Sequence, residues 1–564
     1  MSKSRKQRGG DIPPIQFQDN GVDDALKTLH IDRKILPIID SRNTKNVSVQ
    51  ERYYEMINTN QLQATMALGS LTGGTNTLNF TVPADPQTMI SLPDSYFVVN
   101  LQVTANTYAG GEYEQNFAML PFASKLFLNS IVTNINNQNC SDIVSFTGSY
   151  PYVSFVKQLL LRERQQTTYL VPPHKVYYPD GATALTANNM YKDLCVGQCS
   201  DTAGSEYVSL GLGSETVDDS VVVPGAAEVP AGNVNLIKNH NACWYKNLML
   251  GAENNQQEYD PANFATMSAA GAGNIYKTQN IELIIRPDDG IWLSQSGYLP
   301  TSTQLDITLK INGWLKFMSC VQFQQSVDPA VAAVQPTVSL TGMTLFVNRV
   351  RLTDDSFLEV NRAINEAPFI YNVLNAKAFQ QTINASATSQ TVNIPSCMTG
   401  VVPNLLAVMI VNLTTYNQDV TATDCHPFSC GRKRKIDTRL PLVQKMWCMA
   451  GSKKYPISNE YLCNNSALSQ QYITSTYDEY KKCCLDSDKP FLTYEHWRNH
   501  YTVYFFNLCN DHPLLSATDE TRTGSVSLHI VFDQNPALQL IGVGLFHSQL
   551  SINNNRNVSR INFD

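Results

Sequence analysis

Hydrophobic and polar positions alternate along most of this chain, and long stretches with the 3.6-residue period of a helix are scarce. Residues 78–82 alternate cleanly, and residues 96–103 combine alternation with a short buried run. Seven further segments have the same character and are bounded by Gly, Pro, Asn or Asp: residues 281–285, 305–311, 344–350, 401–411, 502–506, 525–532 and 538–546. This pattern predicts a mainly β protein.

The strand candidates fall into two sets, which indicates two β domains. The first domain is expected over residues 62–323 and the second over residues 336–564. Residues 324–335 consist mostly of small and polar residues with one proline, a composition that is typical of a linker. Residues 1–61 precede the first set of strands and are expected to form an N-terminal arm.

Three segments interrupt the strands. Residues 153–164 are leucine-rich and follow Tyr150-Pro151-Tyr152, and residues 466–484 carry an apolar stripe at helical spacing. Each of these two segments is therefore expected to form a helix between strands, one in each β domain. Residues 200–235 are rich in Gly, Ser, Ala and Val with almost no aromatic residues, which predicts a long surface loop.

Composition narrows the class of protein. The 564 residues suffice for two to four domains at about 150 residues each. Charged residues make up 16%, below the usual level of about 25%, and the net charge is −7, which excludes a histone-like polycation and an acidic disordered chain. The chain contains no run of about 18 uncharged apolar residues, so no membrane-spanning helix is predicted. A surface rich in Asn, Gln, Ser and Thr suits a protein packed against its own copies.

The first ten residues are basic, but no apolar segment follows them, so we expect no secretory signal. The protein is therefore expected to be synthesised in the cytosol. The 13 cysteines are then expected to be mostly buried thiols. The arm's cations, Lys3, Arg5, Lys6 and Arg8, fit either a frayed terminus or contact with nucleic-acid phosphates. The basic run Arg432, Lys433, Arg434 and Lys435 fits a solvated loop, a nuclear-import or nucleic-acid patch, or an ion-pair site between subunits.

Motifs for catalysis or metal binding are weak. The chain has no Gly-x-x-x-x-Gly-Lys-Ser/Thr, His-Glu-x-x-His or Gly-x-Ser-x-Gly motif in a suitable context. Cys195, Cys199, His240 and Cys243 could supply four zinc ligands, but their spacing is not a standard one, and buried thiols with a structural histidine explain them as well. We therefore expect no enzyme, no catalytic residue, no cofactor and no metal.

Segments of the first half follow one another in a characteristic order: residues 78–83, 90–103 and 120–129, then Tyr150-Pro151-Tyr152 with the leucine-rich segment after it, then residues 281–287 and 298–311. In this order they resemble the opening strands, the helix and the last strands of the first jelly roll in one protein family. The family is the double jelly-roll major capsid proteins of tailless icosahedral double-stranded DNA viruses of eukaryotes, such as polintons, adintoviruses, polinton-like viruses and virophages.

The second half continues the resemblance in the same order. Residues 343–351 are similar to the opening strand of the family's second jelly roll, and residues 378–395 with 398–411 resemble its next strands. His426 stands where the family usually has asparagine before Pro427-Phe428, and residues 507–511 depart from its acidic turn. The collinear order of about eight segments carries the resemblance, rather than any single motif.

The resemblance implies a mainly β fold of two tandem eight-stranded jelly rolls, a double jelly-roll, with short inserted helices. It also implies a structural major capsid protein of the virion, assembled in the host cytoplasm or nucleus as trimeric pseudo-hexagonal hexons around double-stranded DNA. Implied partners are further copies of the chain, penton and minor or cement capsid proteins, and genomic DNA through the arm. Residues 200–235 would form an outer tower loop.

Two other functions fit tandem jelly rolls. A carbohydrate-binding or adhesin protein would need an exposed aromatic platform, and an enzyme of cupin or hydrolase type would need clustered His and acidic ligands. His496 and His500 lie four residues apart without a third ligand nearby. Six aromatic residues are of the kind that anchors subunit interfaces, although each also fits a core: Tyr53, Tyr54, Tyr96, Phe97, Tyr371 and Trp497.

Overall fold

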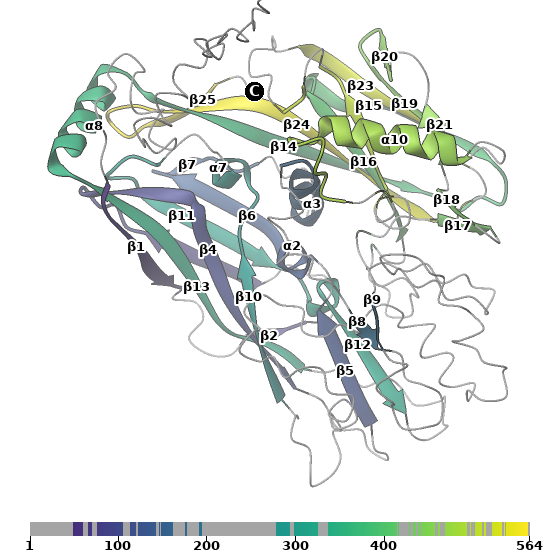
Figure 1. Ribbon diagram of the computed structural model, residues 1–564, viewed down its shortest axis with the longest axis horizontal. Coiled ribbons are helices and arrows are strands. Elements are labelled where there is room, and N and C mark those ends of the chain that lie inside the picture. Colours follow the sequence, from purple (N-terminus) through teal and green to yellow (C-terminus); the bar gives the residue numbers. More distant parts are fainter. Residues whose placement is uncertain are drawn as a thin grey trace, which may run out of the picture.

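Two β sandwiches, joined side by side, form the described part of the protein (Figure 1). The computed structural model describes residues 49–59, 66–69, 76–104, 113–119, 122–142, 146, 148–161, 175–177, 191–193, 278–293, 298–324, 337–413, 416, 428, 432–435, 438–441, 443–456, 461–462, 469–492, 494, 497, 502–509, 512–514, 522–532, 535 and 537–561. The expected arm up to residue 48 and the expected tower loop at 200–235 lie outside these residues.

The first sandwich has two antiparallel sheets. One has the order β1-β13-β4-β10, with β2 also paired to β13, and the other has the order β3-β11-β6-β7. The strands of the first sandwich are β1 (Val49–Asn58), β2 (Met66–Leu68), β3 (Asn76–Val82), β4 (Thr88–Thr104), β6 (Leu128–Ile135), β7 (Gln138–Asn139), β10 (Thr278–Ile285), β11 (Leu305–Ile311) and β13 (Thr337–Leu352).

The second sandwich repeats this layout. Its sheets have the orders β14-β24-β16-β22, with β25 paired to β24, and β15-β23-β19-β20, with β21 paired to β19. Its strands are β14 (Phe369–Ile383), β15 (Gln390–Val401), β16 (Leu405–Asn412), β19 (Val443–Ala450), β20 (Lys453–Tyr455), β21 (Tyr461–Leu462), β22 (Val503–Asn507), β23 (Thr523–Phe532), β24 (Leu538–Ile552) and β25 (Val558–Ile561).

Strand order identifies both sandwiches as jelly rolls. With β1 and β2 counted as one strand, β20 and β21 likewise, and β25 set aside as an additional strand paired to β24, each sandwich has eight strands in chain order. In both, one sheet contains the first, eighth, third and sixth strands, and the other contains the second, seventh, fourth and fifth. This is the two-sheet jelly-roll arrangement. The predicted double jelly-roll is therefore confirmed.

Both jelly rolls also have a helix at the same place, between the fifth and sixth strands. In the first it is α3 (Tyr150–Leu161), and in the second it is α10 (Ser469–Cys483), so both predicted helices are confirmed. Helix α3 begins at Tyr150 itself, because a proline is well tolerated in the first turn, where its missing N–H has no helical partner. The shared insertion extends the likeness of the two halves beyond their strand order.

Strand pairing corrects the expected domain boundary. Residues 343–351 were expected to open the second jelly roll, but they lie in β13, which pairs with β4 on one side and with β1 on the other. The first jelly roll therefore extends to Leu352, whereas it was expected to end at residue 323. Strand β1 likewise belongs to this sheet, although residues 1–61 were expected to form an arm. Periodicity predicts a strand but contains no information about its partner.

Other short elements connect or extend the two jelly rolls. Helix α8 (Asp354–Glu366) links them directly after β13 and was not predicted. Residues 325–335 of the expected linker lie outside the described residues. The remaining elements are α2 (Ala123–Leu126), α7 (Gly290–Leu293), the 3-10 turn η5 (Trp314–Lys316), and the two-stranded antiparallel sheets of β5 (Tyr113–Met119) with β12 (Met318–Gln324), β8 (Lys175–Tyr177) with β9 (Tyr191–Asp193), and β17 (Arg432–Lys435) with β18 (Thr438–Pro441).

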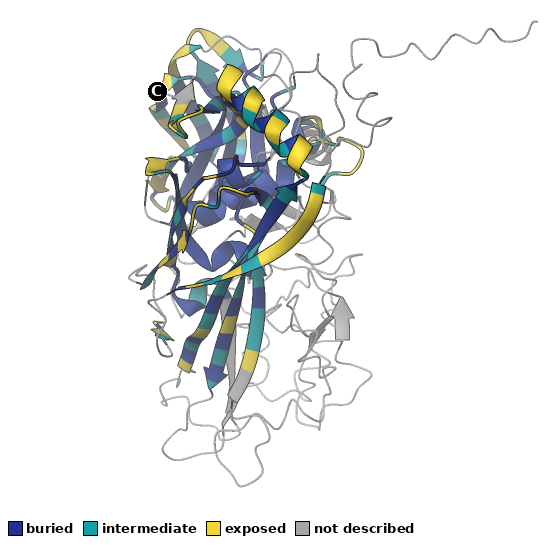
Figure 2. Ribbon diagram, turned by 90° about the vertical axis from the view of Figure 1, so that its left-hand side faces the viewer, coloured by how far each residue is buried: buried dark blue, intermediate teal, exposed yellow. Residues whose placement is uncertain are grey.

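The hydrophobic core spans both jelly rolls. One cluster of buried side chains fills the first sandwich and continues past α3 to the β14-β24-β16-β22 sheet, and a second cluster lies between the two sheets of the second sandwich. In β11 the alternation predicted from sequence becomes alternating burial, with Leu305, Ile307 and Leu309 all inside. Figure 2 shows this buried interior beneath an outer layer of exposed residues.

Candidate assembly surfaces and the junction of the jelly rolls

Aromatic side chains form the centre of the junction between the two jelly rolls. The ring of Phe155, on α3, stacks on the ring of Phe428 with their centroids 4.3 Å apart. Phe122 packs edge-on against Phe155 at 5.1 Å and reaches Phe491 at 5.9 Å. Phe122 and Phe155 come from the first half of the chain, whereas Phe428 and Phe491 come from the second. The two jelly rolls thus share one dry aromatic contact.

Hydrogen bonds extend this junction on both sides. The Tyr480 hydroxyl of α10 donates to the Leu159 carbonyl of α3 at 3.2 Å, so the two equivalent helices are in contact. At the other end, Arg556 Nε donates to the Thr301 carbonyl at 2.7 Å. The Tyr371 hydroxyl donates to a carbonyl of the first jelly roll at 2.8 Å, and burial raises the pKa of that hydroxyl. The two jelly rolls are therefore fixed relative to one another.

Two buried ion pairs lie beside the aromatic contact. Lys125 pairs with Asp288, which also accepts a hydrogen bond from the Ser154 hydroxyl at 2.6 Å. Lys157 Nζ lies 2.6 Å from Asp142 Oδ2. The other oxygen of Asp142 accepts the Ala376 N–H of β14 at 3.0 Å, which ties this pair to the second jelly roll. Buried charges need partners of this kind, because losing one partner leaves an uncompensated charge in a dry site.

A third carboxyl, that of Asp289, completes the cluster. Its Oδ1 accepts the backbone N–H of Asp142 at 2.7 Å, and its Oδ2 has no hydrogen-bond partner among the described residues. Burial, together with the nearby charge of Asp142, raises the pKa of Asp289 from 3.8 to about 7. The folded protein therefore holds the Asp289 proton more tightly than the unfolded chain does.

Stability is expected to depend on pH through Asp289. A carboxyl with a raised pKa stabilises the fold while it is protonated, and that contribution is lost as pH rises from about 4 to about 7. The thermal unfolding temperature of the wild type should decrease as the pH is raised from 5 to 8. It should decrease less in Asp289→Asn, whose amide oxygen can still accept the Asp142 N–H. Equal pH profiles for the two proteins would contradict this assignment.

Most cysteine side chains that the structure describes are buried thiols. Cys483 and Cys484, at the end of α10, are both buried, and burial raises the pKa of Cys484 to about 12. A thiol with so high a pKa is a poor nucleophile and a poor metal ligand at neutral pH. Among the residues that the structure describes, no three His, Cys, Asp or Glu side chains come together as a metal site. Cys195, Cys199, His240 and Cys243 lie outside those residues.

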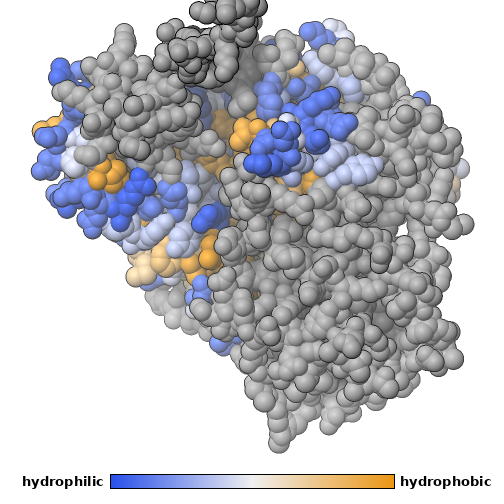
Figure 3. All heavy atoms as spheres, viewed as in Figure 1, coloured by the Kyte–Doolittle hydropathy of each residue, from blue (hydrophilic) through white to orange (hydrophobic). Residues whose placement is uncertain are grey.

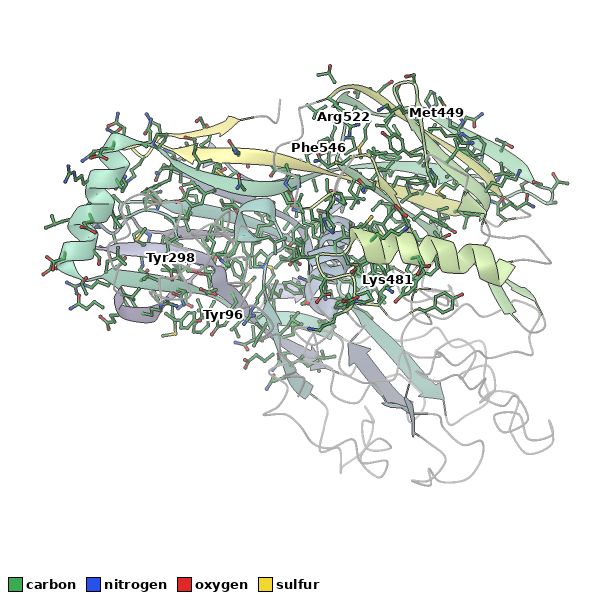
Figure 4. All side chains as sticks on the ribbon, turned by 45° about the horizontal axis from the view of Figure 1, so that its top comes forward. Tyr96, Tyr298, Met449, Lys481, Arg522 and Phe546 are labelled. Carbon is green, nitrogen blue, oxygen red and sulfur yellow. The ribbon has the colours of Figure 1, made fainter. Side chains whose placement is uncertain are left out.

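Strand β1 gives the first jelly roll an exposed edge that carries two tyrosines and a methionine among polar residues. Among the described strands it pairs only with β13, and most of its residues are exposed. Three of these are large hydrophobic residues, with exposed fractions of 38% for Tyr53, 48% for Tyr54 and 66% for Met56. Tyr54 packs edge-on against Tyr96, which stacks on Phe346 at 5.2 Å. Figure 4 shows Tyr96 at the outer side of this sheet. An open edge with exposed aromatic residues is typical of a protein contact surface.

The interface anchors expected from sequence divide into two groups. Tyr53 and Tyr54 are exposed and Tyr96 is partly exposed, whereas Phe97, Tyr371 and Trp497 are buried in the core. The basic run forms strand β17, paired with β18, which makes it part of a hairpin rather than an open loop. The predicted arm cations, Lys3, Arg5, Lys6 and Arg8, lie outside the described residues. The exposed β1 edge was visible in sequence only as single aromatic residues.

The second jelly roll has a partly exposed tryptophan on its outer face. The Trp447 ring of β19 is parallel to the ring of His529 on β23, with centroids 5.2 Å apart. Lys454 Nζ of β20 lies 5.1 Å from the Trp447 ring centroid. Because β19 lies between β23 and β20, these two groups approach the indole from opposite sides. His529 in turn contacts Asn393 of β15 at 2.8 Å, so the row crosses all four strands.

No helix in the described parts of the chain is long and apolar enough to cross a membrane.

No family model matches this chain, and no curated protein matches it. Several solved structures are similar to it. A chain of the Sputnik virophage, solved by cryo-EM, has 11% identity and a TM-score of 0.48, with 92% of this chain and 89% of that chain covered. The mavirus major capsid protein has 10% identity and a TM-score of 0.46, with 93% and 94% covered. The Faustovirus major capsid protein has 9% identity and a TM-score of 0.43, with 97% and 98% covered.

Proposed function

We propose that this chain is a major capsid protein, three copies of which form a pseudo-hexagonal capsomer, or hexon, of an icosahedral virion that encloses double-stranded DNA. The observation that carries the proposal is the repeated architecture. Two jelly rolls with the same strand order and the same inserted helix lie in one chain. Three such chains supply six similar units, which suits a tile with six-sided packing.

Rigidity at the junction supports a mechanical role. A shell tile has to keep its shape while neighbouring tiles press on it, and the shared core, the aromatic contact and the buried ion pairs hold the two jelly rolls as one body. The groups with strongly raised pKa values, such as Asp289 and Cys484, lie in the core and serve packing. We infer a structural protein rather than an enzyme.

The finer assignments follow from this role. We propose that Lys3, Arg5, Lys6 and Arg8 contact the packaged genome, since clustered cations bind phosphates. Residues 200–235 would form a loop at the outer surface of the virion. Penton proteins, minor or cement proteins and further capsomers would contact the sides of the tile, with β17 and its basic residues as a further charged contact. Assembly would take place in the host cytoplasm or nucleus.

The alternative function, a tandem jelly-roll carbohydrate-binding or adhesin protein, has less support. Sugars bind aromatic platforms through an open ring face. Of the tryptophans that the structure describes, Trp292, Trp314 and Trp497 are buried. The fourth, Trp447, has His529 on one side and Lys454 on the other. This arrangement favours assembly over sugar recognition.

The oligomeric state tests the proposal. The purified full-length chain is expected to have a mass in solution of three times its 62.8 kDa, as measured by light scattering coupled to size exclusion, and to give six-sided particles in electron micrographs. Substituting the exposed apolar residue of the β1 edge, as Met56→Asp, should leave the fold unchanged and weaken association. A chain that remains monomeric at all concentrations and binds an immobilised glycan would contradict the proposal.

A further inference from the structure

The outer face of the β15-β23-β19-β20 sheet has an apolar centre with a basic rim. On β19, Lys445, Trp447 and Met449 alternate with buried residues and therefore point outward. Lys454 is the cross-strand partner of Met449, and His529 is that of Trp447. Figure 4 shows Met449 at the outside of the second jelly roll. We name these five residues, Lys445, Trp447, Met449, Lys454 and His529, the basic sheet face.

Among the residues that the structure describes, the charged side chains of this face have one sign. The described strands β15, β19, β20 and β23 contain Lys445, Lys453 and Lys454 and no Asp or Glu. The whole chain carries a net charge of −7, so the acidic residues are concentrated elsewhere. A basic face of this kind favours a partner that is acidic, and it disfavours a second basic face.

The outer side of helix α8 also has an exposed apolar residue, but its neighbouring charges are mainly acidic. Ser356, Val360 and Ile364 are its buried side, and Leu358 on its outer side is 66% exposed. Asp354 and Asp355, one turn before Leu358, are exposed as well. We name Asp354, Asp355, Leu358 and the partly exposed Glu359 the acidic helix face. Figure 2 shows the exposed side of α8 turned away from the molecule, and Figure 3 shows that the end of the molecule that carries α8 is mostly hydrophilic.

The two faces match in chemistry but lie apart in one molecule. Each has an apolar centre, Leu358 on one and Trp447 with Met449 on the other. The rim of the sheet face is basic, whereas the exposed side of α8 is mainly acidic, with Arg362 as its one cation, paired to Glu366 at 3.2 Å. This is the usual composition of a protein interface, with an apolar anchor inside a polar rim. Figure 1 places α8 and the β19–β20 hairpin toward opposite ends of the long axis, so they can meet only between two copies.

We propose that the acidic helix face of one copy docks on the basic sheet face of the next copy. Such a contact joins two different surfaces of the same chain, and contacts of this kind close into a ring when the rotation between copies allows it. In the trimer, each copy then presents its helix to one neighbour and its sheet to the other. This contact rests on the proposed function, because a capsomer requires that copies of the chain associate.

Charge exchange tests the contact. Lys445→Glu with Lys454→Glu places like charges opposite Asp354 and Asp355, and Asp354→Lys with Asp355→Lys does the same from the other side. Each double variant is expected to raise the concentration at which half of the chains are trimeric by at least about tenfold, because like charges across an interface repel. The variant with all four substitutions restores opposite charges at every contact and is expected to form trimers as the wild type does.

A control variant and two distinct outcomes separate a failure of the docking contact from a failure of the proposed function. Lys482→Glu, on α10 and 72% exposed, lies outside both faces and should leave the trimer unchanged. Trimers of the fourfold variant cannot come from a chain that failed to fold, so they separate lost contact from lost structure. Trimers that persist in both double variants would overturn the docking contact alone. A wild-type chain that never forms trimers would instead overturn the proposed function.

Discussion

Lys157→Met is expected to lower the free energy of unfolding by about 3–5 kcal/mol, the usual cost of removing one partner from a buried ion pair. The Lys157 side chain is fully buried, and its Nζ lies 2.6 Å from Asp142 Oδ2. Without Lys157, the Asp142 carboxylate would remain buried in the junction without its cation. The carboxyl of Asp289, which accepts the backbone N–H of Asp142, would lie beside it. The two jelly rolls would therefore separate more easily. Urea unfolding, followed by tryptophan fluorescence, measures the loss.

Two comparison variants make this result specific. Lys482 is 72% exposed and pairs with Glu479 at 3.5 Å, so Lys482→Met should change the stability by no more than about 0.5 kcal/mol. Adding Asp142→Asn to Lys157→Met removes the unpaired charge while an amide oxygen can still accept the Ala376 N–H, so part of the loss should be recovered. Equal effects of the two lysine substitutions would show that the buried pair contributes nothing particular.

Phe155→Ala should cost about 3–5 kcal/mol as well, for a different reason. Its ring is fully buried and packs between Phe122 of the first jelly roll and Phe428 of the second. Truncation removes the stacked contact and leaves a cavity at the centre of the aromatic junction between the two halves. The urea midpoint of the full chain should fall accordingly, and trimers should dissociate at lower urea concentrations than in the wild type.

Phe155→Leu is the matched comparison for this prediction. Leucine keeps most of the apolar volume and loses only the ring stacking, so the cost should be less than half of that of alanine. If both substitutions cost the same, the stacking geometry rather than the buried volume would dominate the junction. If neither substitution had an effect, the shared core would not hold the jelly rolls together.

The strands were largely predictable, because burial in a sandwich follows a period of two. Residues 305–311 were predicted as a strand and form β11 with the same limits. Residues 401–411 were predicted as a single strand, but β15 ends at Val401 and β16 begins at Leu405. Pro403 lies in this gap, and a proline cannot donate to a ladder within a sheet. The apolar run concealed the interruption.

Helix α8 was missed although its sequence contained a signal. Ser356, Val360 and Ile364 recur at four-residue spacing, and Asp354 with Asp355 occupies the first turn, where acidic residues favour helix formation. Strand candidates lie on both sides of this segment, and its helical period is short. The assembly surfaces were less accessible, since Tyr53 and Tyr54 resemble core residues as long as the edge position of β1 is unknown.

By itself the sequence determined where most strands lie, which side of each is buried, and that helices interrupt both sets, because these features depend on local periodicity. Only the tertiary structure decided which strands pair, and thus that β13 closes the first jelly roll rather than opening the second. It also decided that Lys125 meets Asp288, 163 residues away along the chain. Contacts between distant residues depend on how the sheets pack, and no periodic pattern along the chain contains that information.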